Sequence, residues 1–299
     1  MSTGQIHDLG YKRYVGSRRS VDTRWMVIMR HQLSTAWKGW WRFKAALIAA
    51  LIATFATGTV MYFLRNELFR MLGAISGEIV RFSDGLLPFS LIWYCKIGFL
   101  VSLLVCSTVV AGDVQSGAFT FYFARSVRPR DYVLGKLAGL GILLSAIMVA
   151  GPVLLAGFRL GLADNLDQVV ALLPTLPKAL AIGALGTVIY AVVPLGFSAL
   201  VSNPRYAMAL WAAYDIVIGG IAEGIGHVGT SAKAVAAFDL PSALQAVAYD
   251  LFGMRIARGG ITIPTWAAVT SIAVHAVLAI AVVIWRVRRA QQTGVGGAS

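Results

Sequence analysis

The chain has 299 residues, of which 58% are hydrophobic and only 13% are charged, and its mean hydropathy is +0.74. Soluble domains carry roughly 25% charged residues, so this composition excludes an ordinary water-soluble globule. The formal net charge of +13 would suggest nucleic acid as the partner of a soluble protein, but the positions of the cations argue against that partner.

The first 44 residues are polar and basic, so we expect no cleavable leader. Within them, residues 23–44 carry apolar side chains at helical spacing and predict an amphipathic helix lying in the plane of the membrane interface. Four tryptophans in this stretch, Trp25, Trp37, Trp40 and Trp41, are of the residue type that favours the headgroup level. The alternative is that this segment extends the first transmembrane helix upstream.

Six apolar runs follow, each about as long as the 20 residues that a helix needs to cross a bilayer. They cover residues 45–64, 88–111, 133–158, 178–201, 206–226 and 265–285. The runs are apolar on all sides, whereas barrel strands alternate in segments of about ten residues. We therefore expect an all-α membrane protein, with a cytoplasmic segment at 1–44, a six-helix transmembrane domain at 45–286 and a cytoplasmic tail at 287–299.

The cations are divided unevenly between the two sides of these runs. Sixteen lie at the termini or in the second-to-third and fourth-to-fifth connections: Lys12, Arg13, Arg18, Arg19, Arg24, Arg30, Lys38, Arg42, Lys44, Arg125, Arg128, Arg130, Arg205, Arg286, Arg288 and Arg289. Seven lie in the other connections: Arg65, Arg70, Arg81, Arg159, Lys233, Arg255 and Arg258. Because positively charged loops stay in the cytoplasm, we expect both termini inside. The basic excess then reflects topology and contact with the lipid bilayer, and we expect no nucleic acid as a partner.

Two connections on the outer side contain segments too short to cross. Residues 65–85 predict a short amphipathic helix, and residues 241–253, PSALQAVAYDLFG, predict a re-entrant or interfacial helix before the last span. We expect residues 231–263 to dip into the outer leaflet without crossing it, because their charged side chains would be costly at mid-bilayer.

The break between the second and third runs, GDVQSGAFTFYFARSVRPRDYVLGK at residues 112–136, is the most informative segment. Pro129 disfavours helix at Arg128 and can begin the next helix in its first turn. The aromatic side chains at 119 and 121–123 cannot all face lipid alongside the arginines. We therefore expect some of them to contact another protein.

Motifs for chemistry within this chain are missing. There is no G-x-x-x-x-G-K-[ST], H-E-x-x-H, G-x-S-x-G or cysteine pair at metal-ligand spacing. Glu223 and His227 are four residues apart and could bind a metal, but a lone pair of this kind is more often a structural hydrogen bond. We therefore expect no enzymatic activity and no cofactor or metal bound by this chain.

From Asp113 to Lys136 the pattern D-x-x-x-G-x-x-x-x-x-x-A-R-x-V-R-P-R-x-Y-x-x-G-K resembles that of ABC-2 type transporter permeases, the membrane subunits of bacterial type V-like ABC exporters. The layout is also similar, with an in-plane helix, six spans and a long outer insertion before the last. The resemblance implies a coupling helix at about residues 115–130, seated in a cleft of a separate ATPase subunit. It further implies an ATPase dimer that binds ATP and Mg, a second permease copy or a related permease, the bacterial inner membrane, and an optional periplasmic or accessory membrane protein.

The residues that match the family pattern are Asp113, Gly117, Arg125, Arg128, Tyr132 and Lys136. Gln115, Phe121, Phe123 and Arg130 complete the set that we expect to couple the chain to the ATPase. The chain departs from the family where FYFARSVRPR replaces a more usual leucine-rich segment. The expected contact surface is therefore more aromatic and more basic.

Asp215 and Glu223 lie in or near the fifth run and are pathway candidates, because ionisable groups in a bilayer are costly. They could share a cavity wall, since eight residues separate them by about 80° around a helix. Alternatively, Asp215 is neutral or paired internally and Glu223 lies at the outer surface. For His275 we expect a hydrogen bond between helices rather than a proton relay. The glycine pairs Gly135/Gly139 and Gly183/Gly186 predict close helix packing.

The sequence thus favours the permease subunit of an ATP-driven exporter with an unidentified substrate. A first alternative is a mechanotransmitting or regulatory ABC subunit that acts on a periplasmic partner without transport. A second is an ion-coupled carrier that uses Asp215 and Glu223 and needs no ATPase.

Overall fold

The structure is a computed structural model that describes residues 23–39, 41–65, 78–124, 127–229, 231–254 and 262–295. Within these ranges the chain is helical and contains no strand. The expectation of an all-α protein is therefore confirmed.

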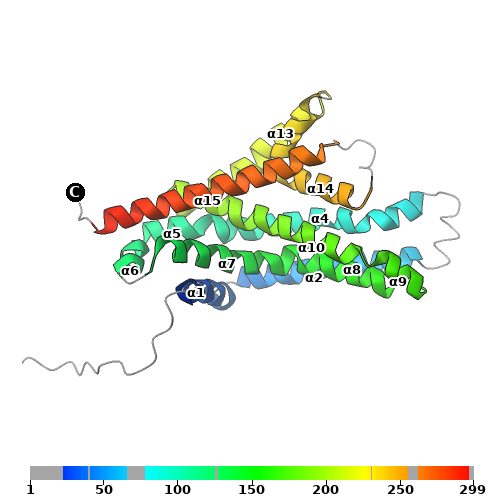
Figure 1. Ribbon diagram of the computed structural model, residues 1–299, viewed down its shortest axis with the longest axis horizontal. Helices are drawn as coiled ribbons and strands as arrows, with labels where there is room; N and C mark the ends of the chain where they lie inside the picture. The colour runs from blue at the N-terminus through cyan, green and yellow to red at the C-terminus, as the bar shows by residue number, and fades with distance from the viewer. Residues whose placement is uncertain are drawn as a thin grey trace, which may run out of the picture.

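Six helical stretches run along the long axis of the molecule (Figure 1). They are Trp41–Leu64, Gly85–Gln115, Pro129–Gly161, Leu166–Leu200, Pro204–Gly226 and Thr265–Gln292, and each is long and apolar enough to cross a membrane. The six predicted spans are thus present as helices. Several extend beyond their predicted ends, and the third begins at Pro129 rather than at residue 133 because proline suits the first turn of a helix.

The stretches are built from shorter elements. They are α2 (Trp41–Arg65); α4 (Glu78–Leu104), η2 (Cys106–Thr108) and α5 (Val109–Gln115); α7 (Pro129–Met148) and α8 (Ala150–Gly161); α9 (Leu166–Leu172), α10 (Thr175–Thr187), η3 (Val188–Val192) and α11 (Val193–Leu200); α12 (Pro204–Ala212), η4 (Ala213–Ile218) and α13 (Gly219–Gly226); and α15 (Thr265–Val295). Both η3 and η4 are wider π-helical turns. Pro194 is the second residue of α11, just after η3. It cannot donate a backbone hydrogen bond, and the wider turn accommodates it.

The core contains large aromatic side chains that hydrogen-bond to hydroxyl groups. Tyr94 and Trp211 are fully buried. The Tyr94 hydroxyl lies 2.7 Å from Thr54 Oγ1, which links α4 to α2, and Trp211 Nε1 donates to Ser102 Oγ at 2.8 Å, which links α12 to α4. Buried polar groups need such partners, so these bonds select one arrangement among apolar helices.

The start of α5 is held by α11. The backbone N–H groups of Val110 and Ala111 donate to Ser198 Oγ, each at 3.0 Å. The first N–H groups of a helix have no partner within it, so the hydroxyl satisfies two of them. This contact sets where α5 points as it leaves the bundle.

Helix α1 (Arg24–Gly39) is separate from α2. Figure 1 shows it end-on, crossing the long axis along which α2 runs. Ile28 and Ala36 are buried and α1 packs on α7, while Trp37 is exposed and Trp25 is half-buried. Trp41 is the first residue of α2, and Trp40 lies outside the described residues. A separate helix is therefore present, and its place in the membrane interface stays a prediction.

The insertion before the last span contains η5 (Ser231–Phe238) and α14 (Leu240–Leu251). The predicted short helix at 241–253 corresponds to α14, which begins where the Asp239 carboxylate accepts a hydrogen bond from the Ser242 N–H at 3.2 Å. The helix predicted at 65–85 falls mainly on residues 66–77, which lie outside the described residues. Its last part, from Glu78, belongs to α4 instead.

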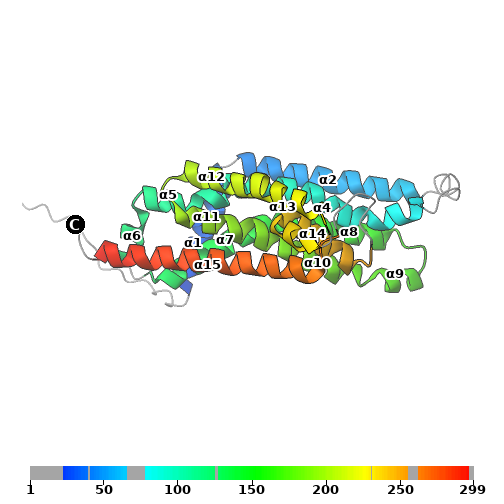
Figure 2. The same cartoon turned by 90° about the horizontal axis from the view of Figure 1, so that it is seen from above.

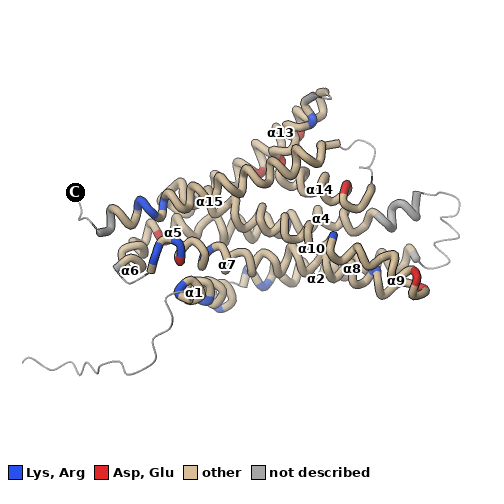
Figure 3. The backbone as a smooth tube through the Cα atoms, viewed as in Figure 1, with Lys and Arg blue, Asp and Glu red and all other residues tan. Residues whose placement is uncertain are grey.

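The two ends of the bundle differ in the elements that they carry. The C-terminal end of α15, α1 and α6 (Ala118–Ala124) lie at one end, and α9 lies at the other (Figures 1 and 2). Lysine and arginine gather at the end with α1 and α6 (Figure 3). This is the end that the charge distribution assigns to the cytoplasm.

Candidate functional site

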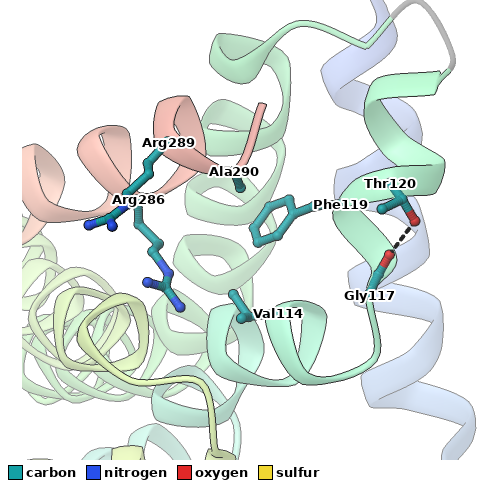
Figure 4. A pocket seen from close by; sticks show the side chains of 7 residues that line it. All are labelled: Val114, Gly117, Phe119, Thr120, Arg286, Arg289 and Ala290. Atoms are coloured by element: carbon teal, nitrogen blue, oxygen red, sulfur yellow. Dashed lines mark hydrogen bonds between the residues drawn. The ribbon is translucent and has the colours of Figure 1, made fainter. Parts of the chain in front are cut away.

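The break at residues 112–136 contains a short helix, α6, between the end of α5 and the start of α7. Helix α5 ends at Gln115, α6 covers Ala118–Ala124, and α7 begins at Pro129. Gly117 has a φ of 66°, a left-handed conformation that glycine adopts without steric cost. Its carbonyl accepts the Thr120 hydroxyl at 2.7 Å (Figure 4). The glycine of the family pattern therefore makes the turn that redirects the chain from α5 into α6.

Asp113, Tyr132 and Lys136 meet at one carboxylate oxygen. Lys136 Nζ lies 2.8 Å from Asp113 Oδ2, and the Tyr132 hydroxyl donates to the same oxygen at 2.7 Å. Lys136 Nζ also lies 5.4 Å from the centre of the Tyr132 ring. The side chain of Lys136 is 5% exposed and that of Asp113 is 18% exposed, so the ion pair is shielded from water. It joins α5 to α7 on the two sides of α6.

The same lysine reaches α1, because Lys136 Nζ donates to Gln32 Oε1 at 3.3 Å. Gly135 and Gly139 allow α1 to approach α7 closely. A Cβ atom at Gly135 would lie 2.7 Å from the Trp25 carbonyl oxygen, and one at Gly139 would lie 3.0 Å from Gln32 Cβ. The predicted close packing at this glycine pair is confirmed, and its partner is α1. Sequence reasoning missed Gln32, since nothing in α1 distinguishes this glutamine.

The aromatic side chains of α6 divide into two groups. Phe119 is buried, stacks on Phe123 with ring centres 5.7 Å apart, and lies 5.1 Å from the Tyr132 ring. The Tyr122 ring lies 5.5 Å from Tyr132, and burial raises the pKa of Tyr122, with a further contribution from the charge of Asp113. Phe121 points outward and is 75% exposed. Of the two expected anchors, Phe121 is therefore accessible, and Phe123 packs within the chain.

Three polar residues of the set expected to couple the chain to the ATPase lie just before or just after α6 in the chain. Gln115, Arg128 and Arg130 are all exposed. The Arg128 backbone N–H donates to Asp131 Oδ2 at 3.1 Å and so caps the start of α7. Arg130 Nε lies 3.9 Å from Asp131 Oδ1. Arg125 lies outside the described residues. The exposed Phe121 of α6 is therefore followed along the chain by two exposed arginines at the start of α7.

The candidate pathway residues lie far along the chain from α6. Asp215 is in η4, and its Oδ1 atom is buried without a hydrogen-bond partner among the described residues, while Glu223 is exposed. Asp239 faces the same helix, since a Cβ atom at Gly219 would lie 2.7 Å from Asp239 Oδ1. Burial raises the pKa of Asp239, and Glu223 adds to the shift. Sequence reasoning missed Asp239 because it lies in a separate element, and a pathway role for these acids stays a prediction.

His275 bridges two helices. Its Nδ1 lies 2.7 Å from the Ser271 carbonyl oxygen, which can only accept, so Nδ1 carries the proton. Its Nε2 lies 2.5 Å from the Tyr214 hydroxyl, within hydrogen-bonding distance. The expected helix–helix hydrogen bond is present. In the part of the chain that the structure describes, no three His, Cys, Asp or Glu side chains gather as a metal site.

No protein-family model matches this chain, and no curated protein matches it. A functional assignment therefore depends on residues 112–136 and on their geometry.

Proposed function

We propose that this chain is the membrane-spanning permease subunit of an ABC-2 type exporter in the bacterial inner membrane. In this proposal both termini are cytoplasmic, and α6 is the coupling helix that docks on a separate ATPase subunit. The observation that supports it most is the meeting of Asp113, Tyr132 and Lys136 at one oxygen. These are the acid, tyrosine and lysine of the family pattern, and they clamp the helices that flank α6.

The geometry suits the transmission of force from α6 to the spans. Phe119 packs on Tyr132 at the start of α7, and α6 also packs on α15. Well-packed interiors are nearly incompressible, so a push on the outer face of α6 moves the ends of α5, α7 and α15 together. Because α7 carries α1, the in-plane helix moves with them.

The chain needs partners for this activity. It lacks a phosphate-binding loop, so ATP and Mg are bound by a pair of ATPase subunits, and the energy of hydrolysis arrives through α6. A second copy of this chain, or a related permease, completes the translocation route. The exposed Phe121 supplies an apolar anchor for the ATPase cleft, and Arg128 supplies charge-assisted hydrogen bonds to its carboxylates.

The test is a paired substitution, Phe121→Ala with Arg128→Glu. Loss of a hot-spot anchor costs about 2 kcal/mol or more, which corresponds to roughly a 30-fold loss of affinity. We expect normal membrane insertion, but weaker co-purification of the proposed ATPase subunit and loss of ATP-driven transport in vesicles.

The matched control is Tyr206→Ala with Arg205→Glu. It also removes an exposed aromatic and reverses an exposed arginine, at the start of α12, which packs on α5. The control pair should assemble and transport as the parent does. If the α6 pair also assembles and transports as the parent does, α6 is not the coupling helix.

The ion-coupled carrier keeps one observation in its favour, the buried and unpartnered oxygen of Asp215. It predicts transport driven by an ion gradient without ATP, abolished by Asp215→Asn. The exporter predicts transport that requires ATP hydrolysis and continues without an ion gradient. A mechanotransmitting subunit would also dock on an ATPase through α6. It differs from the exporter because no transported substrate would stimulate ATP hydrolysis in vesicles.

A further inference from the structure

A hollow of about 350 Å³ lies between the C-terminal end of α15 and the α5–α6 turn. Figure 4 shows its walls: Val114 and Phe119 on one side, and Arg286, Arg289 and Ala290 of α15 on the other. Asp113 and Lys136 do not line it, and neither do Phe121 and Arg128 of the proposed docking surface. The hollow is therefore a separate feature of the same end of the bundle.

The charges around the hollow favour an anion. Arg286 and Arg289 are three residues apart on α15 and so lie on neighbouring positions of one face. Arg286 donates to Ser202 Oγ at 2.9 Å, which uses one of the five N–H donors of its guanidinium. None of the residues that line the hollow is acidic. Two arginine side chains therefore border a space to which no carboxylate of the described residues contributes.

The remaining walls favour a ligand that also has an apolar part. Val114, Phe119 and Ala290 present hydrocarbon beside the arginines. Trp285 precedes Arg286, is half exposed, and lies 5.7 Å below the Arg289 guanidinium. Exposed tryptophan and arginine at the end of an apolar span are typical of the headgroup level of a bilayer. The arginines and the apolar walls of the hollow thus lie at the level of the bilayer where lipid phosphates are found.

From these observations we infer that the hollow binds the phosphate group of an anionic phospholipid from the leaflet on the α6 side. The phosphate accepts hydrogen bonds from Arg286 and Arg289, since guanidinium groups match phosphate oxygens in geometry and charge. The glycerol end of the lipid packs on Phe119 and Val114. The site is independent of the proposed ATPase docking and can be measured on this chain alone.

The test compares lipid retention by the purified chain in nanodiscs of phosphatidylglycerol mixed with phosphatidylcholine, using native mass spectrometry after transfer to detergent. We expect the parent to retain phosphatidylglycerol in preference to phosphatidylcholine. The pair Arg286→Gln with Arg289→Gln should reduce this retention about tenfold or more, the loss expected when hydrogen bonds to a charged group are removed.

Arg288→Gln with Arg205→Gln is the matched control, because it removes two positive charges at exposed positions that do not line the hollow. This pair should retain phosphatidylglycerol as the parent does, and an equal loss in both pairs would overturn the inference. Thr120→Trp is a second variant, which fills the hollow at an exposed position without changing charge. It should also release the lipid, and unchanged retention in this variant would count against the site.

Two further results would assign the hollow to another ligand. Displacement of phosphatidylglycerol by millimolar inorganic phosphate would make it a site for free anions. Retention of phosphatidylglycerol by the arginine-to-glutamine pair, together with weaker ATPase binding, would make the hollow a contact for acidic side chains of a protein partner.

Discussion

The ion pair between Asp113 and Lys136 should contribute to the free energy of unfolding of the whole helical bundle, because it joins α5 to α7. Lys136→Met leaves the Asp113 carboxylate with only the Tyr132 hydroxyl as a described partner and with 18% of its side chain exposed. Breaking a buried pair by removing one partner typically costs 3–5 kcal/mol. Because Asp113 keeps one hydrogen bond and some contact with water, we expect a loss of about 3 kcal/mol in the free energy of unfolding.

A double-mutant cycle tests this reasoning. Asp113→Asn leaves Lys136 nearly buried with Gln32 as its remaining polar contact, so we expect another loss of about 3 kcal/mol. The double variant leaves no unpaired charge and should cost no more than either single change. The coupling energy is then about 3 kcal/mol.

The assay is equilibrium unfolding in mixed micelles, followed by tryptophan fluorescence. Arg130→Gln is the control, because Arg130 lies 3.9 Å from Asp131 and is 63% exposed. Such a surface pair contributes about 0–1 kcal/mol. If the losses at Asp113 and Lys136 are additive, the coupling energy is near zero. That result would refute the claim that the two residues stabilise the protein as an ion pair.

Three other features give predictions of their own. Gly135→Val should cost about 1–3 kcal/mol by forcing α1 from α7, whereas Gly141→Val, with nothing within 4 Å, should cost less; equal losses would contradict the close approach. Reporters fused after residue 299 and within residues 1–20 should both read cytoplasmic, and an external terminus would overturn the topology. A cysteine at Phe238, which is 50% exposed, should react with an impermeant thiol reagent from outside, and one at the buried Ala236 should not; reaction only from the cytoplasm would exclude an outer insertion.

The sequence alone determined the number and approximate limits of the six helical stretches that are long enough to span a membrane. Length and apolar composition are local properties, so a run of about twenty apolar residues predicts a spanning helix without knowledge of its neighbours. Pro129 marked the start of a helix for the same reason, because the missing N–H and fixed φ act within one turn. The residue types of the break were also visible, including the glycine that makes the turn into α6.

Only the tertiary structure decided which of these residues act together. Asp113 and Lys136 lie on different helices, and no local pattern places them at one oxygen. Which of Phe121 and Phe123 is accessible to a partner likewise depended on Tyr132, because Phe119 and Tyr122 of α6 pack on its ring. The approach of Asp239 to Gly219 also joins separate elements.

A physical reason lies behind this division. In a soluble protein, apolar periodicity shows which face of a helix is buried, because the other face meets water. In a membrane the lipid is as apolar as the protein core, so both faces are composed of similar residues. The pairing of helices is then decided by close packing at glycines such as Gly135 and by hydrogen bonds and ion pairs such as that of Lys136, which exist only once the helices have met.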